Sequence, residues 1–240
     1  MAAVTRMTDA GPTPADQRPT GARWPWLVVA AFELSAIVGM VLRAANGEPL
    51  EDQVSFVIAF TMFVTVGAVI VSRDRRNVIG LLLLGSGFIV GCTFFAGELF
   101  TWLVASGRTG PLAVAMGLLN NLGWLFGILP ALFLLPLLFP DGRPPSRRWL
   151  PLVWFVAAFL LLAAIDFVFG QPRLTGSADD LTIANPLYRE AIGGLPSLDP
   201  VFAVLFPLLV LAPVISLTLR FRRESGVARQ QIKWVALGFL

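Results

Sequence analysis

Long apolar runs are the feature that most constrains how this chain can fold. A helix needs about 20 apolar residues, each rising about 1.5 Å, to cross the hydrocarbon core of a bilayer. Six runs reach or approach this length, at about residues 25–42, 54–71, 78–104, 112–139, 149–169 and 200–219. A seventh begins at Trp234. The sequence therefore predicts an all-α, polytopic transmembrane helix bundle with six complete spans and the start of a seventh.

The composition indicates the same solvent. Hydrophobic residues make up 56% of the sequence and charged residues 14%, and the mean hydropathy is +0.77. These values lie outside the usual range of a soluble domain. The single cysteine, Cys92, allows no internal disulfide and lies in an apolar run, where a small buried thiol is the ordinary role. We therefore predict that the lipid bilayer is a partner of this chain.

Basic residues fall mainly on one side of the predicted spans. Because Lys and Arg near span ends are retained in the cytoplasm, this bias predicts the orientation. Of the 18 basic residues, 14 share the side of the N-terminus: Arg6, Arg18, Arg23, Arg73, Arg75, Arg76, Arg143, Arg147, Arg148, Arg220, Arg222, Arg223, Arg229 and Lys233. The other side holds Arg43, Arg108, Arg173 and Arg189, with the acidic residues Glu48, Glu51, Asp52, Asp179, Asp180, Glu190 and Asp199. The sequence thus predicts a multi-pass protein of the cell membrane with a cytoplasmic N-terminus.

The two ends of the chain differ from its middle. Residues 1–23 are polar and rich in Pro, Gly, Thr and Ala, so they cannot bury enough apolar surface to fold alone. They are predicted to form a disordered cytoplasmic tail, and residues 24–240 the membrane bundle. A helix that stopped at Leu240 would leave unpaired carbonyls inside hydrocarbon. We therefore expect the bundle to be incomplete at its C-terminus.

Several function classes lack their necessary residues. The absence of histidine excludes imidazole metal ligands, axial haem ligands and a His base or phosphoacceptor within these 240 residues. The sequence has no Gly-rich phosphate loop and no paired carboxylates that would flank a polar cleft. The pI near 10.0 follows from basic clusters that set topology and contact anionic lipid, rather than from nucleic-acid binding. No catalytic residue, metal site or cofactor site is therefore predicted in this chain.

Five polar residues within the predicted spans are candidate sensing or structural groups: Glu33, Glu98, Asn120, Asn121 and Asp166. Glu33 lies near mid-membrane, either as a glutamic acid hydrogen-bonded to a neighbouring helix or as a ligand- or proton-responsive group. Glu98 and Asp166 fall late in outward-running spans, so we expect solvation at the outer interface, with no deep basic residue to pair with them. The two asparagines are expected to hydrogen-bond between helices, at about 0.6 kcal/mol each.

Two glycine pairs predict close helix packing. Gly87 and Gly91 lie in the third span, and Gly123 and Gly127 lie in the fourth. Small residues four apart allow two backbones to approach closely in lipid, where no hydrophobic force drives helices together. We therefore expect these two spans to pack directly against each other.

Four local motifs appear in a fixed order along the chain: "RRNVIGLLLL" (75–84), "LLPLLFPDGRPPSRRW" (134–149), "ANPLY" (184–188) and "RFRRESGVARQQIKW" (220–234). Together they resemble the N-terminal multi-helix membrane region of actinobacterial sensor histidine kinases. The resemblance extends from about residue 70 to the end, and its last motif is the most specific. The chain departs from the family pattern at Val78, where proline is usual, and at Ala228, where glutamate is usual.

The resemblance implies a role as the membrane-embedded input portion of a two-component sensor histidine kinase. It implies that an unknown envelope or membrane stimulus reaches a cytoplasmic kinase module absent from this chain. ATP and Mg²⁺ would serve that module, a response regulator would receive the phosphoryl group, and the full-length parent would be a homodimer. The candidate residues for lipid contact or signal relay are Arg143, Arg147, Arg148, Arg220, Arg222, Arg223, Arg229 and Lys233.

Two alternatives stay open at the level of sequence. The chain could be a free-standing membrane transporter or scaffold protein. A transporter would be better supported by paired intramembrane charges and by broken helices around a midplane site. The same kind of membrane region could also precede a different signalling enzyme, such as a nucleotide cyclase.

Overall fold

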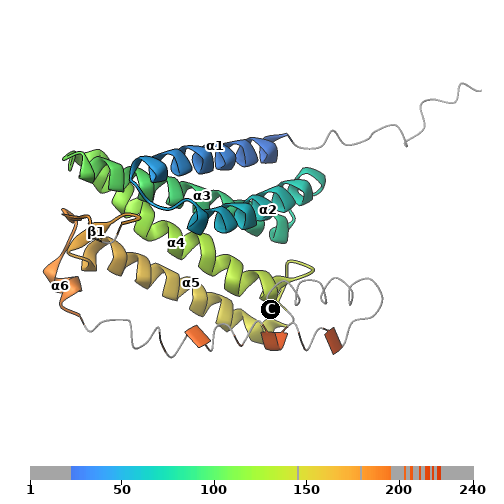
Figure 1. Cartoon of the computed structure of the whole chain (residues 1–240). Helices are drawn as coiled ribbons and strands as arrows, with labels where there is room; N and C mark the ends of the chain where they lie inside the picture. The colour runs from blue at the N-terminus through green and yellow to red at the C-terminus, as the bar shows by residue number, and fades with distance from the viewer. Residues whose placement is uncertain are drawn as a thin grey trace, which may run out of the picture.

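Five long helices dominate the computed structural model (Figure 1). The structure describes residues 23–144, 146–178 and 180–195, together with a few scattered residues between 203 and 222. The long helices are α1 (Trp24–Ala45), α2 (Glu51–Arg73), α3 (Val78–Ala105), α4 (Pro111–Leu138) and α5 (Leu150–Ile165). A 3-10 turn, η2 (Arg147–Trp149), precedes α5, and a π-helical turn, η3 (Asp166–Gly170), continues it.

The five helices are long and apolar enough to cross a membrane, the last one counted over Arg147–Gly170. Their outward side chains are apolar and strongly exposed, for example Leu27, Leu34, Trp154 and Leu161, which suits contact with lipid tails. These properties indicate a multi-pass membrane protein, and they confirm the first five predicted spans as helices. The tail before Arg23, the predicted sixth span at 200–219 apart from scattered positions, and the start of the seventh lie outside the described residues.

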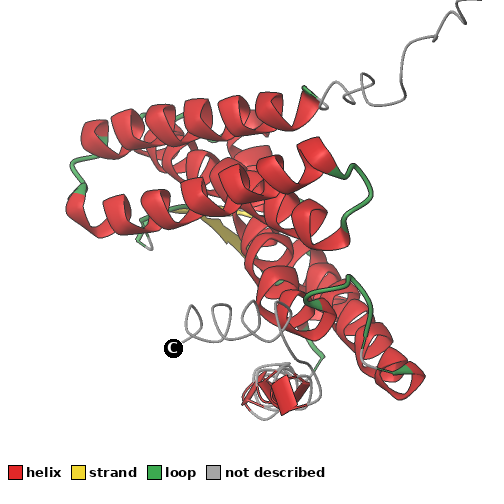
Figure 2. Ribbon diagram, turned by 90° about the vertical axis from the view of Figure 1, so that its right-hand side faces the viewer, coloured by secondary structure: helices red, strands yellow, loops and turns green. Residues whose placement is uncertain are grey.

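Consecutive helices run in opposite directions, so the bundle has two distinct ends (Figures 1 and 2). One end carries the start of α1, the turn between α2 and α3, and the loop 139–149; we call it the basic end. The opposite end carries the turns between α1 and α2 and between α3 and α4, and a short β-hairpin; we call it the hairpin end. α1 and α2 pack on α3, α3 packs on α4, and α4 packs on α5.

Helix α3 lies at the centre of the bundle, with glycine contacts on two sides. A Cβ at Gly87 would meet Val64 of α2, and one at Gly91 would meet Phe32 of α1, at 2.5–3.0 Å. The glycines of α4 face α3 from the other side. A Cβ at Gly123 would collide with the Thr93 side chain, so glycine is required for the close approach of these helices.

The predicted packing of the third span on the fourth is therefore confirmed, but the two glycine pairs do not face each other. Gly127, like Gly123, meets α3, through Val90. Gly87 and Gly91 serve the contacts of α3 with α2 and α1 instead. The sequence identified the small residues correctly and left their partners open, because spacing alone does not say which neighbour a helix face meets.

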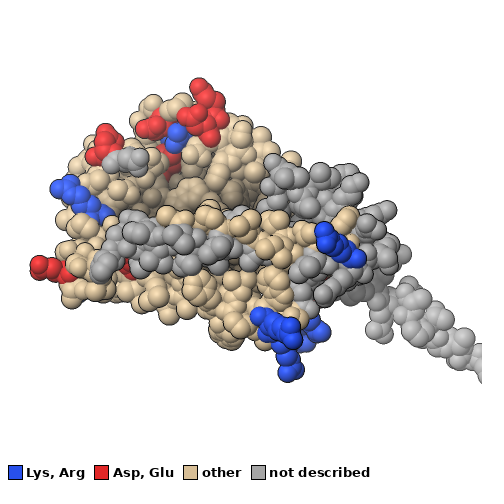
Figure 3. All heavy atoms as spheres, turned by 90° about the horizontal axis from the view of Figure 1, so that it is seen from below, with Lys and Arg blue, Asp and Glu red and all other residues tan. Residues whose placement is uncertain are grey.

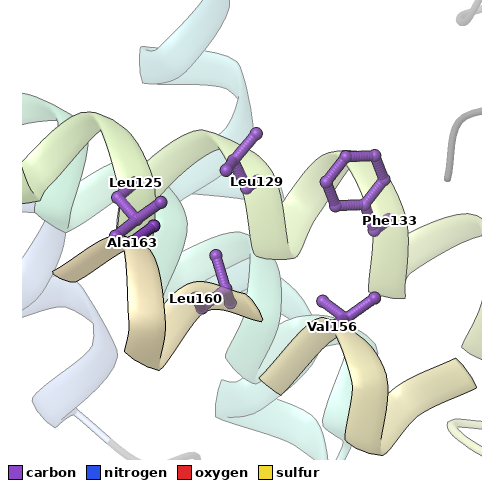
Figure 4. Close-up of a cluster of buried hydrophobic side chains, with 6 residues drawn as sticks. All are labelled: Leu125, Leu129, Phe133, Val156, Leu160 and Ala163. Carbon is purple, nitrogen blue, oxygen red and sulfur yellow. The ribbon is translucent and has the colours of Figure 1, made fainter. Parts of the chain in front are cut away.

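Helices α4 and α5 form a separate apolar contact (Figure 4). Buried side chains of α4 face those of α5: Leu125, Leu129 and Phe133 from the first, and Val156, Leu160 and Ala163 from the second. Their spacing of three and four residues places each set on one face of its helix. This contact attaches α5 to the rest of the bundle.

A two-stranded antiparallel sheet closes the hairpin end, so the described part is not entirely α-helical. Strand β1 (Arg173–Thr175) pairs with β2 (Thr182–Ala184), with Leu174 opposite Ile183. Both of these side chains are buried, and Leu174 is fully so. A one-turn helix, α6 (Glu190–Gly193), follows. Leu187, Tyr188 and Ile192, in the segment after the hairpin, are only half-buried, so the two strand residues are the deeper anchors.

Candidate functional site

The hairpin end contains a buried ion pair between α1 and α3. Nη1 of Arg43 donates to Oε1 of Glu98 at 2.9 Å, and the Glu98 side chain is 0% exposed. Nδ2 of Asn46 donates to the other carboxylate oxygen at 2.9 Å and to the Glu98 carbonyl at 3.1 Å. Each carboxylate oxygen therefore has a donor, as a buried charge requires.

Local structure explains why Arg43 can reach inward. It lies in the last turn of α1, on the same face as the buried residues Phe32, Ala36 and Gly39. Asn46 caps this helix, and Gly47, at φ +80°, turns the chain back toward α2. Nε of Arg43 donates to the Pro49 carbonyl at 2.7 Å in that turn. The turn thus holds the guanidinium through Nε, while Nη1 bonds Glu98.

This arrangement corrects the expectation for Glu98. We expected interfacial solvation and no basic partner within the spans, whereas the carboxylate is fully buried and paired with Arg43. The sequence did contain the signal. Arg43 and Glu98 each lie about 20 residues after the start of parallel-running helices, so at about 1.5 Å per residue they reach similar heights. The prediction treated Arg43 only as a topology marker and did not compare these depths.

The tip of the β-hairpin docks on α3 and α4 through polar contacts. The Thr101 hydroxyl, on α3, lies 2.9 Å from the Ser177 hydroxyl and accepts from the Ser177 amide at 3.1 Å. The Ser177 amide also lies 3.3 Å from the Gly97 carbonyl. From α4, Nδ2 of Asn120 donates to the Thr175 carbonyl at 3.3 Å. The hairpin therefore bonds two helices at once.

The two asparagines of α4 were expected to bond between helices, but their partners among the described residues lie in the hairpin. Asn120, which is 8% exposed, bonds the hairpin backbone. Oδ1 of Asn121 accepts from the Thr175 hydroxyl at 3.5 Å. Oδ1 of Asn120 lies only 2.6 Å from the position that a Cβ on Gly97 would take. Both residues keep the predicted structural role, but they attach a loop.

Asn185, in the "ANPLY" motif, is a polar anchor that the sequence prediction did not single out. Its side chain donates to the carbonyls of Val168 and Gln171, at 2.9 and 2.8 Å, and accepts from the Leu187 amide at 2.9 Å. It is 6% exposed. Asp166 lies nearby and is half-buried, with Oδ2 accepting from Gln171 at 3.0 Å. The Asn-Pro dipeptide, a known turn former, was the available signal.

Glu33 lies apart from this polar cluster. It is half-buried on the flank of α1, and no described residue makes a hydrogen bond or ion pair with its carboxyl group. The nearby Ser35 hydroxyl donates to the Phe32 carbonyl at 2.7 Å instead. The expectation that Glu33 bonds a neighbouring helix therefore finds no partner within the described part of the chain.

Two of the motif loops meet at the basic end. Asn77 caps α3, with Oδ1 accepting from the Gly80 amide at 3.0 Å. Gly142, at φ +70°, lies in the loop after α4, and a Cβ there would be 3.0 Å from Cβ of Val78. The "RRNVIG" and "FPDGR" segments are thus in contact, which their separation in sequence did not reveal.

The charges divide between the two ends of the bundle. On the face in Figure 3, the acidic atoms in view gather at the hairpin end, on the left, where some basic atoms also lie, while the other end shows basic atoms. Arg143, Arg147, Arg148 and Arg222 are exposed. The remaining candidates for lipid contact or relay, Arg220, Arg223, Arg229 and Lys233, lie outside the described residues. The exposed arginines of the basic end form a surface suited to anionic headgroups.

The described residues line a small apolar cavity. A cavity between α1, α2 and α3 has a volume of about 10 Å³ and an apolar lining that includes Phe32, Phe56 and Phe94, which is room for about one water molecule. The described residues contain no group of three or more His, Cys, Asp or Glu side chains that could hold a metal ion. Comparisons with family models, curated proteins and solved structures found no match.

Proposed function

We propose that this chain is the input portion of a two-component sensor histidine kinase in the cell membrane. In this proposal the N-terminus and the basic end lie in the cytoplasm, and the hairpin end lies outside. A stimulus from the envelope or the membrane changes the arrangement of the helices. A cytoplasmic kinase module outside these 240 residues reads that change, uses ATP and Mg²⁺, and passes the phosphoryl group to a response regulator.

The contact between Gly142 and Val78 is the observation that best supports the proposal. It joins two of the four segments that resemble the sensor kinase family, and these segments are about 60 residues apart in sequence. Shared motifs that set topology alone would need only basic charge near each span. A shape-dependent contact between two of them favours a common surface at the basic end.

The two helices behind this surface are also those that hold the hairpin. Thr101 of α3 and Asn120 of α4 bond the hairpin at one end of the bundle, and Val78 and the loop after α4 meet at the other. A ligand that binds one arrangement of the hairpin more tightly would favour the matching arrangement of α3 and α4. The size of this population shift is set by the difference in the ligand's affinity for the two arrangements. Such a shift would reach the basic end through the length of both helices.

Cysteine labelling tests the proposed orientation. Single cysteines are introduced in a Cys92→Ala background, as Ser146→Cys at the basic end or Asp180→Cys at the hairpin end. Both Ser146 and Asp180 are exposed. A membrane-impermeant maleimide added to intact cells should label Asp180→Cys, and should label Ser146→Cys only after lysis. The reverse pattern would place the basic end outside and overturn the orientation.

The coding sequence after the Leu240 codon tests the kinase assignment. We expect an in-frame continuation that encodes a His-containing dimerisation helix and an ATPase domain. Membranes that contain the complete protein should then form acid-labile phosphohistidine with ATP and Mg²⁺. A stop codon with no such module nearby would refute the kinase and favour a free-standing membrane protein, while a cyclase domain would keep the input role and change the output.

A further inference from the structure

Helix α1 carries a stripe of exposed and half-buried residues with Glu33 at its centre. The stripe residues are spaced alternately four and three apart, and none of them is buried. We call this set the Glu33 stripe: Trp26, Ala30, Glu33, Ile37, Met40 and Ala44. This spacing is the pattern by which two helices pack side by side along their length. The buried face of the same helix, with Phe32, Ala36 and Gly39, already contacts the bundle.

A second exposed stripe on α1 has the same spacing and serves as an internal comparison. We call it the Leu34 stripe, and it consists of Leu27, Ala31, Leu34, Val38 and Val41. Ile37 and Leu34 are exposed to almost the same extent, 61% and 64%. The two stripes differ in one chemical respect, because only the Glu33 stripe contains a polar group. Lipid tails suit the Leu34 stripe, which needs no other partner.

The Glu33 carboxyl group does need a partner. Ionisable side chains in membrane spans almost always face a protein interior or water and are paired. Glu33 has neither a hydrogen bond nor an ion pair with any residue between Arg23 and Leu195 that the structure describes, and it lies about halfway along α1. A carboxylic acid group has one O–H donor and acceptor oxygens. It is therefore complementary to a second group of the same kind.

We propose that the Glu33 stripe is the interface at which two copies of this chain dimerise. The two α1 helices lie parallel about a two-fold axis along the membrane normal. In such an interface each residue of the stripe meets its own counterpart. The two Glu33 side chains bond reciprocally, each O–H donating to the carbonyl oxygen of the other, and Ala30 allows the backbones to approach closely. A polar residue at one position of such a seam also fixes the register of the helices.

The position of α1 leaves room for this partner. Among the described helices, α1 packs on α2 and α3, and it lies at the edge of the bundle away from α5 (Figures 1 and 2). A second copy can therefore approach without displacing a described element. The dimer requires only that α1 lies in a bilayer, so it does not depend on the proposed kinase output.

Disulfide crosslinking in membranes tests the geometry. In the Cys92→Ala background, single cysteines are introduced at Ala30 or Ile37 of the Glu33 stripe, and at Ala31 or Leu34 of the Leu34 stripe. Mild oxidation should give covalent dimers several-fold faster for the first two variants than for the second two. Equal rates on both stripes, preference for the Leu34 stripe, or no dimer in any variant would overturn the proposal.

Substitution of Glu33 tests the chemistry. Self-association of the 240-residue chain is measured by energy transfer between labelled copies as they are diluted with lipid. Glu33→Gln keeps a donor and an acceptor and should retain the dimer, whereas Glu33→Leu should weaken it about tenfold. Leu34→Met is the matched control and should leave association unchanged. Unchanged association of Glu33→Leu, or lower stability of that variant with no change in association, would show that Glu33 bonds within its own chain or not at all.

Discussion

Removal of Arg43 should destabilise the bundle more than removal of any exposed arginine. Arg43→Met keeps most of the side-chain length but leaves the Glu98 carboxylate, at 0% exposure, without the guanidinium that lies 2.9 Å away. Stranding one member of a buried ion pair typically costs about 3–5 kcal/mol. For a chain of this size each kcal/mol lowers Tm by about 2–4 °C, so we expect a decrease of about 6–20 °C.

The double variant separates the stranded charge from the lost packing. Arg43→Met combined with Glu98→Leu removes both charges and fills the space with apolar atoms, an exchange that is often neutral or stabilising in protein interiors. We therefore expect the double variant to recover at least about 2 kcal/mol relative to Arg43→Met alone. A loss of stability in Arg43→Met that the double variant recovers would identify the stranded buried charge as the cause of the loss.

Cys92 provides a native reporter for this experiment. Its thiol is partly buried, so a thiol-reactive dye that fluoresces on coupling records unfolding of detergent-solubilised protein during heating. Arg108→Met is the matched control, since Arg108 is exposed at the same end and lies over the Trp102 ring at 5.1 Å, a contact of about 0.5–1 kcal/mol. If the double variant is less stable than Arg43→Met by the full cost of Glu98→Leu, the two residues are not coupled and the argument from burial is refuted.

Three further predictions use the same dye assay or proteolysis. Gly123→Ala places a methyl group against Thr93 and should lower the stability by about 1–3 kcal/mol. Its control, Gly85→Ala, has open space around it and should raise the stability by up to about 1 kcal/mol through helix propensity. Equal effects of the two substitutions would contradict the packing. Asn185→Ala leaves buried carbonyls without donors, at about 1–3 kcal/mol, and limited proteolysis should cut the hairpin segment faster than in an Arg189→Ala control. Val78→Pro should be neutral or stabilise by up to about 1 kcal/mol, because it occupies the first position of α3 after a residue that is already extended; a loss of more than about 1 kcal/mol would show that the family pattern does not fit this loop.

Helix positions could be predicted from this sequence because lipid imposes a length and an apolar composition on every span. The predicted third span, 78–104, differs from α3 by one residue at its end, since Asn77 gives a strong capping signal and Gly107 a turn. The π-helical turn and the hairpin that follow α5 were not predicted. The turn lies at the end of the predicted fifth span, where an ordinary helix was expected. The hairpin forms in a loop of mixed composition, where contacts with α3 and α4, rather than local pattern, select the conformation.

The partners of polar side chains were harder to predict than the helices. Asn120 and Glu98 were both recognised as costly in a membrane, but the rotation of each helix decides what they meet, and rotation depends on every neighbour. Asn120 meets a hairpin that lies 55 residues further along the chain. The partner of Glu33 could not be predicted either, because nothing in its local sequence says whether a neighbouring span covers it.

The ion pair between Arg43 and Glu98 cannot form until both residues have been synthesised. The two residues are 55 positions apart, and at about 5–20 residues per second the ribosome takes about 3–11 s to add that length. During this interval Arg43 is present without its carboxylate. Two partners of Arg43 in the following loop are made sooner. The Pro49 carbonyl, 2.7 Å from Nε, and the Glu48 carboxylate, 3.8 Å from Nη2, are added within about the first second after Arg43 at these rates. These loop contacts can therefore hold the guanidinium at the membrane surface until α3 arrives, and a change at Glu48 should slow assembly more than it lowers the stability of the finished bundle.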